Sequence, residues 1–153
     1  MKLFEEYRIV DPSGNDFTWK KIKHPEFKYE VTKRYSVQLS YCPPTPIRTR
    51  YFSFLKNGVL TVEIGYRWDG ASGPTIDTIS TMRGSCCHDI PYQMFREGTL
   101  SREFKENADR TLQLMLMEDY HPENIFEEVW STTRAGYYYQ AVNLFGWWAC
   151  RAS

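Results

Sequence analysis

The feature that most constrains the fold is an alternation of mainly apolar and polar residues between positions 29 and 41. The odd positions carry Tyr29, Val31, Lys33, Tyr35, Val37, Leu39 and Tyr41, and the even positions carry polar residues throughout. Successive side chains of a strand point to opposite faces, so the pattern predicts a continuous strand with one buried face. Prolines at positions 43, 44 and 46 end it, because proline has no amide hydrogen for the sheet ladder.

Two turn sequences predict β-hairpins in the same half of the chain. Asn57-Gly58 stands between runs at 51–55 and 59–66, and Asn-Gly favours the positive φ angles of a tight hairpin turn. The run Tyr7–Val10 precedes Asp-Pro-Ser-Gly-Asn at positions 11–15, a set of residues typical of turns. We therefore expect the first half of the chain to be rich in antiparallel β-structure.

The second half of the chain carries helical periodicity. Apolar residues recur at helical spacing from Arg102 to Asp119, directly after Ser101, which can cap a helix N-terminus. A longer helical pattern begins at Pro122 and ends at Phe145, before a glycine. A shorter helix is expected over residues 82–95, where Pro91 removes one backbone hydrogen bond and would delay the start of the helix or kink it.

Strands followed by helices indicate an α+β fold. We expect N-terminal antiparallel β-hairpins or a sheet packed against about three C-terminal α-helices. At 153 residues the chain is expected to form a single domain, with a β-rich part over 1–66, a polar loop over 67–81 and a helical part over 82–153.

Charge and hydropathy argue against two classes of partner. Nineteen basic and nineteen acidic residues give a formal net charge of zero, whereas a nucleic-acid-binding surface needs an excess of lysine and arginine. Acidic residues follow Met-Lys-Leu-Phe at the start, and the chain has no apolar run of about 18 residues, so we expect neither a signal peptide nor a transmembrane segment. The four cysteines lack metal-finger spacing and are expected to be reduced.

The most elaborate polar segment spans residues 65–92. A loop punctuated by glycine and proline carries Asp69, and the helix after it carries His88, Asp89 and Tyr92. Residues three and four apart share a helix face, so these three side chains project to one side. Histidine titrates near neutral pH, which suits a general base, and aspartate supplies the hard oxygen atoms that bind divalent metals.

Asp109 lies at the edge of the apolar stripe of the next helix, where its carboxylate would be partly buried. A buried carboxylate needs a partner, and His88, Tyr92 and Arg83 are the candidates. The same requirement supports a second interpretation, in which these residues form a satisfied hydrogen-bond network that pins the loop onto the helices. A catalytic or metal site and a structural network are both open at this point.

Several single residues in this segment also carry two interpretations. Asp69 precedes a glycine and suits a turn as well as a metal ligand, and Asp77 suits either a helix cap or a ligand. Cys87 is more simply a buried, inert thiol than a nucleophile. Ser72 lacks the strand–turn–helix setting of hydrolase serines.

The order of these motifs resembles an uncharacterised family of tailed phages and bacterial prophages, known only as a domain of unknown function. The shared motifs are Asp69-Gly-Ala-Ser-Gly-Pro, His88-Asp-Ile-Pro-Tyr, Arg102, Ala-Asp109 and a tyrosine-rich stretch ending in Phe145-Gly. Trp68 and Asn143 replace the usual threonine and basic residue. The resemblance implies a phage-encoded protein that acts in the host cytoplasm or in the virion.

The motif from His88 to Tyr92 also resembles that of phospholipase A2. This resemblance implies that Asp89 binds calcium together with carbonyl groups of the preceding loop. It further implies that His88 activates water and that Asp109 and Tyr92 support the histidine. The chain departs from those enzymes at Pro91, where their helix carries cysteine, and in its β-rich first half.

If this site is catalytic, the sequence predicts a metal-assisted or His-based hydrolase of an ester, cell-wall or phosphodiester bond. The candidate catalytic residues are His88, Asp109, Tyr92 and Arg83, and the candidate ligands of a divalent metal, calcium or zinc, are Asp69 and Asp89. His88 would be the base, Asp109 would orient it, and Tyr92 or Arg83 would stabilise developing charge. The alternative is a non-enzymatic virion, tail or assembly protein that docks on other phage proteins through aromatic side chains, which make up 16% of the chain.

Overall fold

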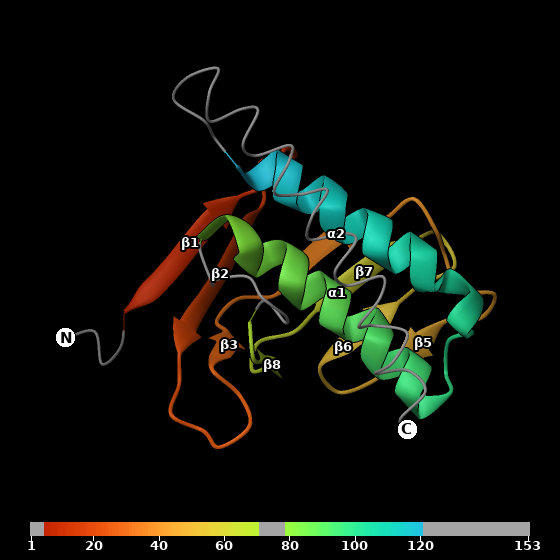
Figure 1. Ribbon diagram of the computed structural model, residues 1–153, viewed down its shortest axis with the longest axis horizontal. Helices are drawn as coiled ribbons and strands as arrows, with labels where there is room; N and C mark the ends of the chain where they lie inside the picture. The colour runs from red at the N-terminus through yellow and green to blue at the C-terminus, as the bar shows by residue number, and fades with distance from the viewer. Residues whose placement is uncertain (1–4, 71–78, 121–153) are drawn as a thin grey trace. The chain divides into compact units, whose positions relative to one another are not determined.

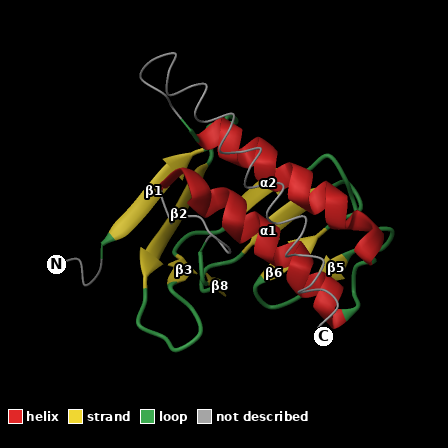
Figure 2. Ribbon diagram, in the orientation of Figure 1, coloured by secondary structure: helices red, strands yellow, loops and turns green. Residues whose placement is uncertain are grey.

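The computed structural model (Figure 1) describes residues 5–70 and 79–120 of the chain. These residues fall into two compact units, Met1–Gly70 and Ala71–Ser153, each of which is described by itself. The boundary between the units lies inside the polar loop predicted at 67–81. The described strands, yellow in Figure 2, belong to the first unit, and the described helices, red in Figure 2, belong to the second.

The first unit contains two antiparallel sheets of four strands each. The first sheet has the order β1 (Glu6–Val10), β2 (Asp16–Lys21), β3 (Tyr29–Val31) and β8 (Arg67–Trp68). The second sheet has the order β4 (Tyr35–Gln38), β7 (Val59–Val62), β6 (Phe52–Phe54) and β5 (Ile47–Arg48). Together with the helices of the second unit, these sheets confirm the α+β class.

Both predicted hairpins are present, as β1–β2 and β6–β7. In the β6–β7 turn, the amide of Gly58 donates to the carbonyl oxygen of Leu55 at 2.9 Å, and Gly58 has φ of +86°. No described residue other than glycine has a positive φ, so this turn uses one positive φ angle, at Gly58, and Asn57 keeps a negative one. The expectation that both residues of Asn57-Gly58 would supply positive φ angles is therefore corrected.

The prediction of one continuous strand over residues 29–41 is wrong. The segment forms two strands, β3 and β4, which belong to different sheets. The amide of Val31 donates to the carbonyl oxygen of Tyr66, and the amide of Gly65 donates to the carbonyl oxygen of Val31. Tyr35, four residues later, pairs instead with Val62 of β7 in the second sheet. Tyr29, Val31 and Tyr35 are nevertheless buried as predicted, because the alternation reports which face is covered and not which strand is the neighbour.

The core of the first unit is largely aromatic. Phe17 on β2 has no exposed surface, and its ring centroid lies 5.3 Å from that of Tyr35, 5.5 Å from that of Trp19 and 5.9 Å from that of Trp68. Because Phe17 belongs to the first sheet and Tyr35 to the second, these rings form one core shared by both sheets. Part of the high aromatic content of the chain is therefore explained by core packing.

The second unit contains α1 (Ile79–Glu97) and α2 (Lys105–Asp119), which run side by side in Figure 1. The helices pack closely at Gly84, where an added Cβ would lie 3.0 Å from Cδ1 of Leu112. Glycine at this position lets the two helices meet without a side chain between them. Between the helices, the side chain of Ser101 accepts a hydrogen bond from the amide of Glu103 and caps the short helix η1 (Arg102–Phe104).

The helices predicted over 82–95 and 102–119 are thus present, with two differences. Helix α1 begins before residue 82 and runs through Pro91 as one helix, and the first turn of the second pattern is the separate 3-10 helix η1. About three helices were expected, whereas residues 5–70 and 79–120 contain two α-helices. The helix predicted from Pro122 to Phe145 lies outside the described residues.

Candidate functional site

The structure brings three of the six predicted site residues into direct contact. Arg83, His88, Asp89 and Tyr92 lie on α1, Asp109 lies on α2, and Asp69 follows β8 in the first unit. The side chains of His88 and Tyr92 both hydrogen-bond to Asp109, and these contacts join the two helices. We refer to His88, Tyr92, Asp109 and Lys105, which is described below, as the Asp109 cluster.

One oxygen of Asp109 receives two hydrogen bonds from α1. Nε2 of His88 lies 2.7 Å from Oδ1 of Asp109, and the hydroxyl of Tyr92 donates to the same oxygen at 2.6 Å. The imidazole and phenol rings have centroids 4.1 Å apart, because residues four apart are neighbours on one helix face. This pair of contacts fixes the orientation of both rings against the carboxylate.

The other oxygen of Asp109 is bound by Lys105, which the sequence reasoning missed. Nζ of Lys105 donates to Oδ2 at 2.9 Å, and this lysine is buried, with 9% of its surface exposed. The two residues are four apart on α2, so the spacing on the predicted helix was the signal that could have revealed the pair. The ammonium group adds a positive charge beside the carboxylate, which stabilises its ionised form.

The charge state of Asp109 follows from its surroundings. Burial raises its pKa, but the hydrogen bond and the charge of His88, together with the bonds from Tyr92 and Lys105, outweigh burial and leave the pKa lowered. Asp109 is therefore a carboxylate, which can only accept hydrogen bonds, so Nε2 of His88 carries a proton and donates. In the neutral imidazole the lone pair is then on Nδ1, and no hydrogen bond to Nδ1 comes from residues 5–70 or 79–120.

Arg83 lies in a different cluster at the contact of α1 and α2. Its Nε donates to both carboxylate oxygens of Asp119, at 2.9 and 3.1 Å, and a terminal nitrogen donates to Glu118 at 2.6 Å. The side chains of Arg83 and Asp119 are 1% and 0% exposed. The structure therefore places Arg83 with the acidic C-terminal turn of α2, and we assign it to helix packing, not to the cluster around Asp109.

The predicted metal ligands lie in different units. Asp89 is half-buried on α1, and Asp69 is exposed at the end of the first unit. Within the described residues, no three side chains of histidine, cysteine, aspartate or glutamate are grouped so that they could hold a metal ion. Asp77, expected as either a helix cap or a ligand, and Ser72 lie outside those residues.

The adjacent cysteines on α1, Cys86 and Cys87, are buried and are not joined in a disulfide. Burial raises the pKa of the Cys86 thiol well above its usual range, and the neighbouring Cys87 and Asp89 add to the rise. The thiol of Cys86 is therefore protonated, which makes it a poor nucleophile.

Fold and site together define an α+β protein with a buried Asp109 cluster between two helices. Among the described residues, neither helix combines the length and the apolar character needed to cross a bilayer. The chain matches no protein-family model, and comparisons with curated proteins and with solved structures find no match. The resemblances to the phage family and to phospholipase A2 therefore stay predictions, although His88 and Tyr92 do lie against Asp109 as the second resemblance implies.

Proposed function

We propose that the protein is a hydrolase in which His88 is the general base. The observation that carries the proposal is the 2.7 Å contact between Nε2 of His88 and the ionised Asp109. This contact fixes the tautomer whose Nδ1 accepts a proton, so a water molecule at Nδ1 would lose its proton to the imidazole as it attacks the substrate. The buried carboxylate then stabilises the imidazolium that forms.

The other members of the Asp109 cluster are positioning residues in this proposal. Tyr92 shares Oδ1 with His88, and Lys105 occupies Oδ2, so the carboxylate cannot rotate away from the imidazole. The hydrogen bond from Lys105 also favours the ionised form of Asp109. Both groups act on the base through Asp109, and neither is assigned contact with substrate.

No step of this proposal uses a metal ion, since the described residues do not form a metal site. Asp69 and Asp89 stay predictions as ligands of calcium or zinc. The bond that is hydrolysed, an ester, a cell-wall bond or a phosphodiester, stays open, as do the phage origin and the location in host cytoplasm or virion.

A second candidate function rests on the burial of the same residues. Asp109 has no exposed surface, His88 is 8% exposed, and all the contacts made by Asp109 described above join α1 and α2 or lie within α2. A buried hydrogen-bond network of this kind can stabilise a helix pair without any chemistry. In that case the protein would be a non-enzymatic phage virion, tail or assembly protein.

Two substitutions of His88 separate the candidates. His88→Ala removes both the hydrogen bond to Asp109 and the base, whereas the amide nitrogen of His88→Gln can replace Nε2 as donor but supplies no base. Hydrolysis of p-nitrophenyl acetate and bis-p-nitrophenyl phosphate would be measured together with urea unfolding. His24→Gln is the matched control, because His24 is exposed and lies outside the cluster.

For a hydrolase, both His88 variants should lose about 10²–10⁴-fold in rate, while His88→Gln keeps most of the stability. For a structural network, the wild type hydrolyses neither compound, His88→Ala loses about 1–3 kcal/mol and His88→Gln recovers part of it. Hydrolysis that survives in His88→Gln at the wild-type rate contradicts the proposed base.

A further inference from the structure

A polar pocket of about 450 Å³ lies on the second sheet, in the unit that does not contain the Asp109 cluster. Its volume falls within the range of small-molecule sites. The residues that line it are Arg34, Arg48, Thr49, Arg50, Phe52, Ser53, Glu63 and Ile64. Three guanidinium groups and one carboxylate leave this lining with a net charge of +2.

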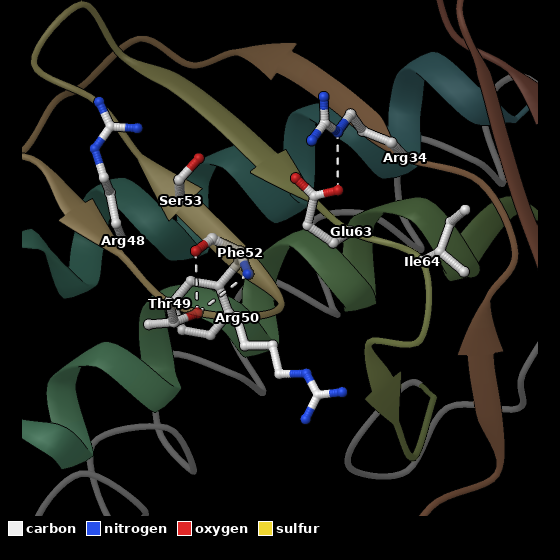
Figure 3. A pocket seen from close by; sticks show the side chains of 8 residues that line it. All are labelled: Arg34, Arg48, Thr49, Arg50, Phe52, Ser53, Glu63 and Ile64. Atoms are coloured by element: carbon white, nitrogen blue, oxygen red, sulfur yellow. Dashed lines mark hydrogen bonds and ion pairs between the residues drawn. The ribbon is translucent and has the colours of Figure 1, made fainter.

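The strand register places part of this lining on one face of the second sheet. Arg48 on β5 pairs with Ser53 on β6, and Ser53 pairs with Thr61 on β7, so the three side chains form a row across neighbouring strands. The preceding pair in the register, Ile47 and Phe54, points to the other face and is buried. Figure 3 shows the side chains of Arg48 and Ser53 rising from adjacent strands, with the Arg34–Glu63 pair beyond them.

Several hydrogen-bond donors in the pocket have no partner among the described residues. Arg34 uses Nε for Glu63, at 2.8 Å, which leaves its two terminal nitrogens. The guanidinium of Arg48 and the hydroxyl of Ser53 make no hydrogen bond or ion pair with any described residue. These donors are therefore available to a ligand that supplies several acceptor oxygens.

Two other lining residues, Thr49 and Arg50, are not available as donors to a ligand in the pocket. The hydroxyl of Thr49 donates to the carbonyl oxygen of Phe52 and accepts from its amide, so it is committed to the β5–β6 turn. The guanidinium of Arg50 lies 5.2 Å from the centroid of the Tyr51 ring and, in Figure 3, points away from Arg48 and Arg34. Arg34, Arg48 and Ser53 thus supply the available donors of the lining.

We propose that this pocket binds the phosphate group of a small phosphorylated molecule, with Arg48, Ser53 and Arg34 as its donors. A phosphate monoester presents three terminal acceptor oxygens, so it can accept from all three residues, whereas a carboxylate presents only two oxygens. Planar guanidinium groups bind pairs of phosphate oxygens, and the serine hydroxyl supplies a further donor. The pocket is wider than a phosphate ion needs, so an attached organic group has room.

Calorimetric titration with inorganic phosphate and with glucose 6-phosphate tests this site on the full chain. We expect saturable binding, tighter for the ester because it also contacts the walls of the pocket. Arg48→Gln should weaken binding about tenfold or more, since it removes a charged hydrogen-bond donor, and Ser53→Ala should weaken it less. Both residues lie on the polar face of the sheet, so these variants should fold.

Arg8→Gln is the matched control, because Arg8 is an exposed arginine of the same unit that does not line the pocket. It should bind both phosphates as the wild type does. The proposal is overturned if neither compound binds, if potassium chloride at equal ionic strength gives the same heats, or if Arg8→Gln and Arg48→Gln weaken binding equally.

Discussion

Tyr35 donates a hydrogen bond of 2.5 Å from its hydroxyl to Oδ2 of Asp11, and both residues are buried. Asp11 belongs to the turn of the β1–β2 hairpin in the first sheet, and Tyr35 begins β4 in the second sheet. Oδ1 of Asp11 accepts the amides of Ser13 and Asn15, at 2.9 Å each. One carboxylate therefore closes the turn of one sheet and ties it to a strand of the other.

Tyr35→Phe should destabilise the protein by about 1–3 kcal/mol, because it removes a donor from a buried carboxylate and leaves the aromatic packing in place. Urea unfolding measures the change. Tyr51→Phe is the control, since Tyr51 is 38% exposed and should lose almost nothing. Equal losses in the two variants would show that the contact with Asp11 contributes no stability.

Gly58→Ala should cost more stability than Gly14→Ala. Both glycines have φ near +85°, so each substitution carries the cost of about 1–2 kcal/mol of a left-handed alanine. At Gly58 the new Cβ would also lie 2.7 Å from Nε2 of Gln38 and 2.9 Å from the carbonyl oxygen of Leu39, whereas at Gly14 nothing lies within 4 Å. Thermal unfolding of both variants compares the two costs, and equal melting temperatures would refute the predicted clash.

Local signals account for the parts of the fold that the sequence predicts. The turn after Val10, the turn at Gly58 and the cap at Ser101 each depend on residues within a few positions of one another. The same holds for the pairing of His88 and Tyr92, which share a helix face. Such features require no knowledge of which distant segment lies alongside.

Features that depend on distant pairing were not predicted. The alternation over 29–41 does not predict that β3 ends at Val31, which is hydrogen-bonded to Gly65 and Tyr66, because one long strand would show the same alternation. The partners of Arg83, at the far end of α2, depend likewise on how the two helices align, which the contact at Gly84 helps to set. The sequence limited the partners of Asp109 to His88, Tyr92 and Arg83. Choosing among these three required the alignment of α1 with α2.

Arg83→Met should destabilise the protein by about 3–5 kcal/mol, since it removes the guanidinium from a buried carboxylate, Asp119. The matched control is Arg110→Met, because Arg110 is exposed and pairs with Glu106 at 3.8 Å, an arrangement worth about 0.5 kcal/mol at most. Urea unfolding of both variants measures the difference. A loss in Arg83→Met no larger than that in Arg110→Met would contradict a stabilising role for the buried pair.

Asp109→Asn should remove a pH-dependent contribution to the free energy of unfolding. The folded protein lowers the pKa of Asp109 below its ordinary value of 3.8, so the ionised carboxylate stabilises the fold above that pH. This contribution is lost as the pH falls below 3.8 toward the folded pKa. The difference in unfolding free energy between wild type and Asp109→Asn should therefore shrink as the pH falls below 3.8. Glu106→Gln, an exposed carboxylate on α2, is the control, and a difference for Asp109→Asn that does not change in acid would contradict the prediction.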